Sequence, residues 1–313
     1  MKIIEKEQVL SNLSFDALID ALNTSFSGNF LMPQRQVFEL QPGDPSHNAF
    51  AVLPAWDEEV IGVKSFTYFP QNSEAGFESL YSKIMLFDRA HGVPLALVDG
   101  TSVTLWRTAA VSALAARYLA HEDAEHLVFF GSGNLASYMI KAHLSVRNYR
   151  KVTIIGRNRD KVDSLISQLQ SEFSHVAFVV GQSDKETIAS ACTISCATGS
   201  PEPLFDGSWL SAGTHIDLIG NHHKHCRECD TQTVTQSEVY VDGLTNVLNE
   251  AGELLIPIAE GAFSQQQIKG ELADLCAKRV SGRQQENSIT LFKSVGTALS
   301  DLVAANLVYK LTK

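Results

Sequence analysis

Two apolar runs in the middle of the chain end in glycine-containing turns at a spacing that suits nucleotide binding. The first covers 127–130 and ends in Gly131-Ser132-Gly133; the second covers 152–155 and ends in Gly156-Arg157-Asn158-Arg159. Glycines let the backbone approach a pyrophosphate, and the following helix N-terminus supplies N–H donors. The pattern indicates a β-α-β dinucleotide site, with an ordinary strand-to-helix turn as the alternative, because Ala136 occupies the third glycine position.

The end of the second run indicates which dinucleotide is preferred. A site that prefers NAD usually carries Asp or Glu there, to bind the ribose 2′-OH, and this chain has neither. Arg157 and Arg159 would suit a 2′-phosphate. We therefore expect NADP(H) as the preferred cofactor, with NAD(H) as the alternative.

Three cations in the first third of the chain could bind a small carboxylate. Arg35 follows Pro33-Gln34, Lys64 lies inside an apolar strand pattern, and Arg107 lies near the start of an alanine-rich helix. A half-buried cation needs a partner, and arginine offers a carboxylate two parallel hydrogen bonds. The alternative is that each cation pairs with a structural carboxylate or extends to water.

The segment 215–230 is rich in possible metal ligands. His222, His223, His225, Cys226 and Cys229 lie close together, and the two cysteines have zinc-like spacing. A second cysteine pair at a suitable distance is missing, so we expect no metal. A histidine of this segment facing a substrate is the favoured interpretation, because small ligands bind at the carboxyl edge of such sheets.

These residues need a scaffold of two kinds. Residues 122 to about 240 alternate strand and helix, with strands expected at 127–130, 152–155, 176–180, 192–197, 215–219 and 238–241, which predicts a doubly wound parallel sheet. The first 120 residues predict a mixed α+β unit, with a helix at 14–26 and strands at 50–54, 60–66 and 81–87. Hairpin connections are expected at 88–92 and at Asp99-Gly100.

Residues 289–296 lead into a helix at 297–309, which we expect beyond the last sheet strand and packed on the N-terminal unit. The pattern therefore divides the chain into a mixed unit, formed by the N-terminal part and the C-terminal helix, and a doubly wound unit between them. The fold class is α/β with an additional α+β unit.

Composition excludes several classes of protein. The chain has 313 residues, 44% of them apolar, and a formal net charge of -10. Without a long basic run, nucleic acid is not an expected partner, and without a long apolar stretch no membrane partner is expected. Five cysteines with no framework spacing favour reduced thiols in the cytoplasm.

The chain resembles the ornithine cyclodeaminase/μ-crystallin family over nearly its whole length. The resemblance rests on Pro33-Gln34-Arg35, Gly62-Val63-Lys64, the segments 88–99 and 105–115, Gly131-Ser132-Gly133, Gly213-Thr214-His215 with Ile219-Gly220, Arg227-Glu228, and 292–296 with Asp301. It implies a homodimer in which 1–121 plus 293–313 form the substrate-binding and dimerisation domain, with a Rossmann NAD(P)-binding domain at 122–292 inserted. It also implies that residues matching Arg35, Lys64 and Arg107 bind the substrate carboxylate. It also implies hydride exchange between nicotinamide and the α-carbon of an amino acid or its imine.

Two departures from the family pattern narrow the reaction. Ornithine cyclodeaminases carry an Asp after the glycine that matches Gly220, whereas His222 stands there in this chain, preceded by Asn221. The cyclase reaction is therefore in doubt. Leu135 stands where many members have Gln, which we expect to change only cofactor packing.

We therefore expect an NAD(P)H-dependent oxidoreductase that reduces a small cyclic imino acid, Δ1-pyrroline-2-carboxylate to L-proline. Ornithine cyclodeaminase or alanine dehydrogenase activity is one alternative, and a crystallin-like NADP(H)-dependent ligand-binding protein is another. Lys64, Arg107 and His222 are the expected catalytic residues, with Arg35 also binding substrate. The expected cofactor contacts are Gly131, Gly133, Asn134, Leu135, Arg157, Asn158, Arg159, Thr198, Asn221, Lys293 and Ser294.

Overall fold

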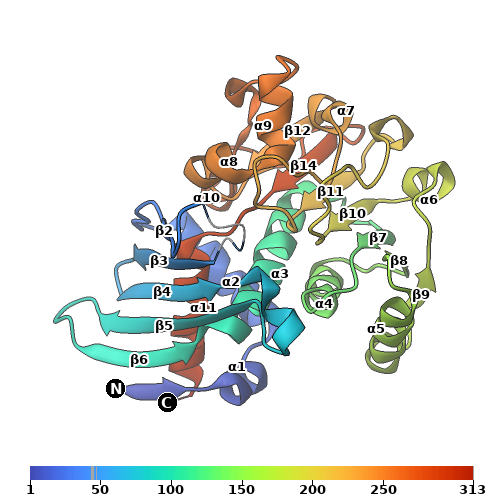
Figure 1. Ribbon diagram of the computed structural model, residues 1–313. Coiled ribbons are helices and arrows are strands. Elements are labelled where there is room, and N and C mark those ends of the chain that lie inside the picture. Colours follow the sequence, from blue (N-terminus) through green and yellow to red (C-terminus); the bar gives the residue numbers. More distant parts are fainter. Residues whose placement is uncertain (44–45, 47, 313) are drawn as a thin grey trace. The chain divides into compact units, whose positions relative to one another are not determined.

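The computed structural model of the chain describes residues 1–43, 46 and 48–312 (Figure 1). The chain forms two compact units. Unit 1 comprises Met1–Arg107 and Thr297–Lys313, and unit 2 comprises Thr108–Gly296. Within the described residues, no helix is long and apolar enough to cross a membrane.

Unit 1 is built around a six-stranded sheet in the order β1-β6-β5-β4-β3-β2. Helix α11 packs against one face of this sheet, and α2 packs against α11; Figure 1 shows α11 lying across the strands. Ser14 caps α2 by accepting a hydrogen bond from the Ala17 amide, and the apolar residues of α2 are buried. The elements of unit 1 are β1 (Lys2–Ile4), α1 (Lys6–Asn12), α2 (Phe15–Ser27), β2 (Gln36–Glu39), β3 (Ala49–Trp56), β4 (Val60–Tyr68), η1 (Pro70–Ala75), β5 (Leu80–Asp88), β6 (Pro94–Asp99) and α11 (Ala298–Leu311).

Unit 2 contains an eight-stranded sheet in the order β13-β12-β14-β11-β10-β7-β8-β9, in which every pair is parallel. Strands buried on both faces are near-continuous apolar runs, as the four apolar residues that follow His126 in the fully buried β7 illustrate. The elements are the part of α3 (Gly100–Leu119) from Thr108 onward, β7 (His126–Phe130), α4 (Ala136–Val146), β8 (Lys151–Ile155), α5 (Arg159–Glu172), β9 (Ala177–Val180), α6 (Lys185–Ala189), β10 (Thr193–Cys196), η2 (Gly207–Trp209), β11 (His215–Leu218), α7 (Thr231–Thr235), β12 (Ser237–Val241), α8 (Leu244–Glu250), α9 (Gly252–Ala259), η3 (Gln265–Gln267), β13 (Gly270–Glu271), α10 (Leu272–Cys276) and β14 (Ile289–Lys293).

The strand order locates the switch point of the sheet. The chain runs outward from β7 through β8 to β9 and then returns to place β10 on the other side of β7. The loops after β7 and β10 therefore separate at the carboxyl edge, which is where ligands bind in open α/β sheets. The expected doubly wound parallel sheet is confirmed.

Strand β14 was not expected as part of the sheet. Residues 289–296 were predicted only to lead into the C-terminal helix, but β14 pairs with β11 on one side and β12 on the other. A short apolar run followed by a helix does not reveal that it inserts between two strands that come earlier in the chain.

The expected hairpin at Asp99-Gly100 is wrong, whereas the 88–92 segment does join the antiparallel strands β5 and β6. Helix α3 begins at Gly100. The Asp99 carboxylate accepts hydrogen bonds from the Ser102 amide at 2.9 Å and the Ser102 hydroxyl at 2.6 Å, which caps the helix.

The first boundary between the units lies inside α3, after Arg107, rather than at residue 121. The second half of α3 is tied to unit 2, because the Ser112 hydroxyl donates a hydrogen bond to Asp217 of β11. Arg147 also donates hydrogen bonds to the carbonyl oxygens of Ala116, Arg117 and Ala120 at the end of this helix. The second boundary lies after Gly296 rather than between 292 and 293.

Candidate active site

A cavity of about 500 Å³ lies at the switch point of the unit 2 sheet. The segments that line it follow β7, β8 and β10, so three carboxyl ends of parallel strands form its wall. The lining residues are Phe130–Gly133, Ile155–Asn158, Lys161, Ser183, Ala197–Ser200 and Leu204. This position matches the dinucleotide site that the sequence predicts.

The first glycine of the loop after β7 is required by the backbone. Gly131 has a φ of 134°, a conformation that favours glycine, and a Cβ there would lie 2.9 Å from the Ala197 carbonyl oxygen. Gly133 lines the cavity, and no atom lies within 4 Å of the position a Cβ would take. The loop therefore keeps open space beside its backbone, which fits the approach of a pyrophosphate.

The basic residues after β8 divide into two groups. Arg157 lines the cavity together with Lys161, a residue that the sequence analysis did not select. Arg159 does not line it; its Nε atom donates to the exposed Asp163 one turn along α5, at 2.8 Å. Asn158 lines the cavity, and its side-chain oxygen caps α5 by accepting from the Lys161 amide.

Two further predicted cofactor contacts lie beside the cavity rather than on its wall. Asn134 is exposed, and Leu135 stands at the N-cap position of α4 without a side-chain hydrogen bond. Thr198, by contrast, lines the cavity after β10.

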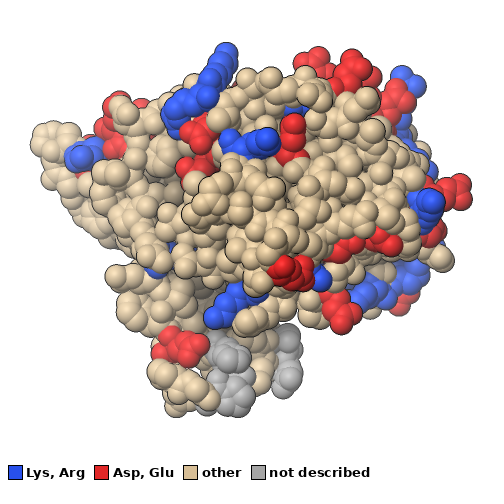
Figure 2. Space-filling model, turned by 90° about the horizontal axis from the view of Figure 1, so that it is seen from above, with Lys and Arg blue, Asp and Glu red and all other residues tan. Residues whose placement is uncertain are grey.

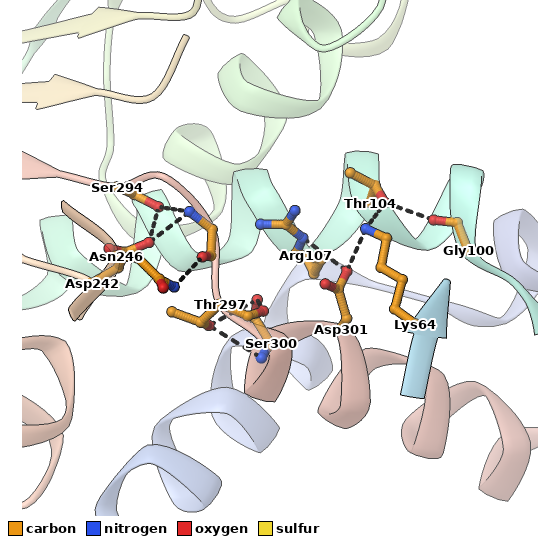
Figure 3. A network of polar contacts seen from close by, with 11 residues as sticks. Lys64, Gly100, Thr104, Arg107, Asp242, Asn246, Ser294, Thr297, Ser300 and Asp301 are labelled. Atoms are coloured by element: carbon orange, nitrogen blue, oxygen red, sulfur yellow. Dashed lines mark hydrogen bonds and ion pairs between the residues drawn. The ribbon is translucent and has the colours of Figure 1, made fainter. Parts of the chain in front are cut away.

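Asn221, Lys293 and Ser294 do not line the cavity, and the structure gives their side chains other partners. Lys293 is fully buried, with Nζ 3.0 Å from a Glu253 carboxylate oxygen and 2.7 Å from the Asn221 carbonyl oxygen. The Asn221 amide donates to the Ser200 carbonyl, and the Ser294 hydroxyl donates to Asp242 at 2.6 Å (Figure 3). These side chains support loops, and direct contact of the cofactor with Asn221, Lys293 and Ser294 stays a prediction.

In unit 1, Lys64 and Arg107 meet at one carboxylate, that of Asp301 (Figure 3). Lys64 Nζ and Arg107 Nε each lie 3.0 Å from Oδ1 of Asp301. Lys64 also donates to the Thr104 hydroxyl at 2.6 Å. β4 supplies the lysine, α3 supplies the arginine and threonine, and α11 supplies the aspartate, so three elements converge on this cluster.

Arg35 belongs to the same neighbourhood, since its charge acts on Lys64. Burial lowers the pKa of Lys64 to about 8; Asp301 opposes this, while the positive charges of Arg107 and Arg35 lower the pKa further. The three cations predicted as a group thus lie near one another. Among the described residues Arg107 contacts Asp301 through Nε, and a guanidinium held in this way can offer its terminal nitrogens to an anionic group.

His222 is exposed in the loop after β11, with its ring 4.5 Å from the His223 ring. Within the described residues, no group of three or more His, Cys, Asp or Glu side chains is placed to hold a metal ion. Cys229 is buried in the core of unit 2, whereas Cys226 is partly exposed.

Three residues important to these sites were not selected from the sequence for a role: Asp301, Lys161 and Glu228. Asp301 and Glu228 were noted only as parts of motifs. Asp301 contacts Lys64, 237 positions away, and Glu228 accepts a hydrogen bond from the Thr198 amide, 30 positions away. Lys161 lies in the first turn of α5, shortly after Arg157, and a basic residue at this place was the available signal.

Charges elsewhere are dispersed. Acidic and basic side chains are intermixed over the face of the molecule seen in Figure 2, and the described atoms of that face form no continuous basic area. This distribution agrees with the formal net charge of -10.

Comparison with known proteins identifies relatives over the full length. The chain is 56% identical over 310 residues to a Δ(1)-pyrroline-2-carboxylate reductase from Colwellia psychrerythraea, with 98% of each chain covered. A solved Δ(1)-pyrroline-2-carboxylate reductase from Thermococcus litoralis, in complex with NADH and L-proline, is 30% identical with a TM-score of 0.92, covering 100% of this chain and 97% of that one.

An archaeal alanine dehydrogenase dimer with bound NAD has the same TM-score of 0.92 at 24% identity, covering 100% of this chain and 96% of that one. Proteins named for different reactions thus share this fold equally well, so the fold alone does not select the reaction. The ornithine cyclodeaminase/mu-crystallin family matches residues 1–313. The chain belongs to this family.

Proposed function

We propose that the chain reduces Δ1-pyrroline-2-carboxylate to L-proline with NAD(P)H. The 56% identity to the Colwellia reductase, across 98% of both chains, is the observation that carries this proposal. The chain is an NAD(P)-dependent oxidoreductase that acts on the C=N or CH–NH group of an imino or amino acid. The names of its relatives describe this class of reaction. The cation cluster of unit 1 provides for the carboxylate of such a substrate.

Arg35, Lys64 and Arg107 bind the substrate carboxylate in this proposal. The Asp301 carboxylate fixes the Nε edge of Arg107, which directs the terminal nitrogens of the guanidinium elsewhere (Figure 3). A guanidinium held at one edge is pre-organised to give a carboxylate two parallel hydrogen bonds. Holding the substrate in one orientation supplies much of the rate of such reactions.

Lys64 is suited to proton delivery as well as binding. Reduction of an imine requires a hydride at carbon and a proton at nitrogen, and the nicotinamide cofactor supplies the hydride. A lysine with a pKa of about 8 can release its proton near neutral pH far more readily than an exposed lysine. Lys64 therefore donates the proton to the imine nitrogen or hydrogen-bonds beside it, and His222 is a candidate for proton exchange with solvent.

The cavity at the switch point holds the dinucleotide in this proposal. Gly131 and Gly133 admit the pyrophosphate, and Thr198 lies on the wall after β10. Arg157 and Lys161 together favour a 2′-phosphate, so NADPH is the preferred cofactor. Arg159 contributes little, because it already pairs with Asp163.

The homodimer is proposed to form through the open face of the unit 1 sheet. Helix α11 covers the other face (Figure 1). Apolar side chains of four neighbouring strands point to the open face and stay partly exposed: Phe50, Val52, Pro54, Ile61, Val63, Met85 and Leu97. Contiguous apolar areas of this kind are typical of surfaces between subunits.

Five free cysteines support the cytoplasm as the location of the protein in this proposal.

The test is to follow NADPH consumption with Δ1-pyrroline-2-carboxylate as substrate. Parallel assays supply NADH with the same imine, pyruvate with ammonia and NADPH, and ornithine with NAD. Rapid consumption with the cyclic imine, and little with the other substrates, is the expected result. Turnover of ornithine or pyruvate with none of the imine would replace this proposal by a cyclodeaminase or an alanine dehydrogenase.

A further inference from the structure

Three ionisable side chains are completely buried together beneath the loops that follow β10 and β11. Glu228 belongs to the segment between β11 and α7, Glu253 to α9 and Lys293 to the end of β14. Each is 0% exposed. We call these residues the Glu228 cluster. A buried charge is costly unless it has partners, so the contacts of this cluster indicate what it holds.

Glu228 joins the two loops directly. Its Oε1 atom accepts from the Thr198 amide at 2.6 Å and from the Thr198 hydroxyl at 2.9 Å, and its Oε2 atom accepts from the Gly220 amide at 2.8 Å. The ladder between the strands ends just before, where the Ile219 amide donates to the Cys196 carbonyl. The carboxylate thus continues the connection between β10 and β11 beyond their last hydrogen bond.

The loops are packed so closely that this connection determines their positions. A Cβ at Gly220 would overlap the Thr198 backbone and lie 2.6 Å from Glu228 Oε1. Thr198 lines the cofactor cavity, together with Gly199 and Ser200. The hydrogen bonds of Glu228 therefore hold a residue of the cavity wall.

The other two members hold Glu228 and the same loops. Lys293 Nζ lies 3.0 Å from Glu253 Oε2 and donates to the Asn221 carbonyl, the residue after Gly220. Glu253 Oε1 accepts from the Glu228 amide at 3.2 Å. The cluster therefore places two carboxyl groups and one lysine together without exposure to solvent.

Burial raises the pKa of Glu228 to about 7; Lys293 opposes this, and Glu253 raises it further. The thiols of Cys196 on β10 and Cys229 beside Glu228 are also near, and burial raises their pKa values well above the ordinary range, so they are neutral. Among these groups, Glu228 is therefore the one whose pKa is raised into the neutral range.

We propose that Glu228 is a positioning residue that holds the Thr198 and Gly220 loops only as a carboxylate, so that proton uptake by the cluster loosens the cavity wall and weakens nicotinamide cofactor binding. The reason is the number of donors and acceptors. A carboxylate can accept all three hydrogen bonds, whereas the O–H of a protonated carboxyl group would face one of the three donors, and that hydrogen bond would be lost. The proposal rests on the proposed use of a nicotinamide cofactor in this cavity.

The first experiment measures the dissociation constants of NADPH and NADH by fluorescence, without substrate, between about pH 5.5 and about pH 8.5. The wild-type Kd should rise as the pH falls, by up to about tenfold per pH unit below the midpoint. Glu228→Gln should bind both dinucleotides weakly at every pH. The NH2 group of the glutamine would face the Gly220 N–H, and two donors cannot form a hydrogen bond. Glu238→Gln, a carboxyl on β12 that contacts neither loop, is the matched control and should keep the wild-type curve.

Glu253→Gln separates a positioning role from a merely structural one. Removing this negative neighbour frees Lys293 to act on Glu228, so the midpoint of the Kd curve should move to lower pH. Loss of packing alone would weaken binding without moving the midpoint. A wild-type Kd that is flat with pH, or an unshifted midpoint in Glu253→Gln, would overturn the proposal.

A second measurement does not depend on the cofactor. Amide hydrogen exchange of the free protein, corrected for the intrinsic pH dependence, should show protection of 197–200 and 219–222 falling as the pH decreases, and Glu228→Gln should lack that protection at all pH values. If neither dinucleotide binds at any pH while this protection still changes with pH, the proposed cofactor fails and the Glu228 clamp stands. Protection that does not vary with pH contradicts the clamp itself.

Discussion

The Lys64 ammonium and the Asp301 carboxylate form an ion pair at 3.0 Å in which both side chains are almost fully buried. Arg107 shares the same oxygen, Oδ1, of Asp301. The second oxygen, Oδ2, is buried and has no hydrogen-bond partner among the described residues. One negative charge therefore orients two cations and keeps Lys64 protonated against the cost of burial.

Asp301→Asn should change the pH dependence of turnover. The pKa of Lys64 is about 8, and the negative charge of Asp301 raises it. Replacing Asp301 by a neutral residue should therefore lower the pKa of Lys64. A reaction that needs the Lys64 ammonium loses kcat/KM as the pH rises through this pKa, and in the variant the loss should begin about one pH unit lower. Plots of log kcat/KM against pH for both proteins test this; coincident curves would contradict the assignment of Lys64.

Arg107→Ala should raise the KM for the imino acid by about 100-fold, since hydrogen bonds to charged groups contribute about 1.5–3 kcal/mol. The KM of Arg107→Lys should lie between those of the wild type and Arg107→Ala, because lysine keeps the charge but cannot form two parallel hydrogen bonds. Arg89→Ala, an exposed arginine between β5 and β6, is the control. An unchanged KM in Arg107→Ala would remove Arg107 from the carboxylate site.

Lys161→Ala and Arg157→Ala should each lower the preference for NADPH over NADH by about tenfold, through weaker binding of the 2′-phosphate. Arg159→Ala provides a matched control from the same segment, because Arg159 pairs with Asp163 and does not line the cavity. The ratio of kcat/KM values for the two cofactors is the measurement. Equal effects from all three variants would point to general electrostatics rather than a defined phosphate site.

His215 should make unit 2 sensitive to acid. Burial lowers its pKa to about 3, although Asp217 opposes this. The unfolded chain then binds more protons than the folded one below an ordinary histidine pKa of about 6.5, so stability falls as the pH decreases through that value, by up to about 1.4 kcal/mol per pH unit. Urea unfolding at about pH 7 and about pH 5 should show a smaller loss in His215→Asn than in the wild type. Equal losses would refute this assignment.

Met85→Asp should dissociate the proposed dimer, because it places a charge at the centre of the apolar sheet face. Light scattering after size-exclusion chromatography measures the mass directly. Val179→Asp is the control, since Val179 is also an exposed apolar strand residue but belongs to β9 of unit 2. A monomeric wild type, or a dimeric Met85→Asp, would place the interface elsewhere or exclude it.

The sequence by itself determined the features whose causes are local. The apolar runs predicted β7 and β8, and the position of the glycines predicted the loop at Gly131. Glycine is required there because the φ is 134° and a Cβ would lie too close to Ala197. Ser14 marked the start of α2 in the same way. The motifs around Arg35, Lys64 and Arg107 also sufficed for the family, since the match covers the whole chain.

Only the tertiary structure decided which residues act on one another across long separations in the chain. Asp301 lies 237 positions from Lys64, and no local pattern reveals that an acidic residue in a C-terminal helix meets a lysine in β4. The same holds for β14, which inserts between earlier strands, and for Lys293, whose partner is buried in α9. Local propensity acts over a few residues, whereas burial and ion pairing depend on how distant segments pack, and the roles of Asp301 and Glu228 follow from that packing.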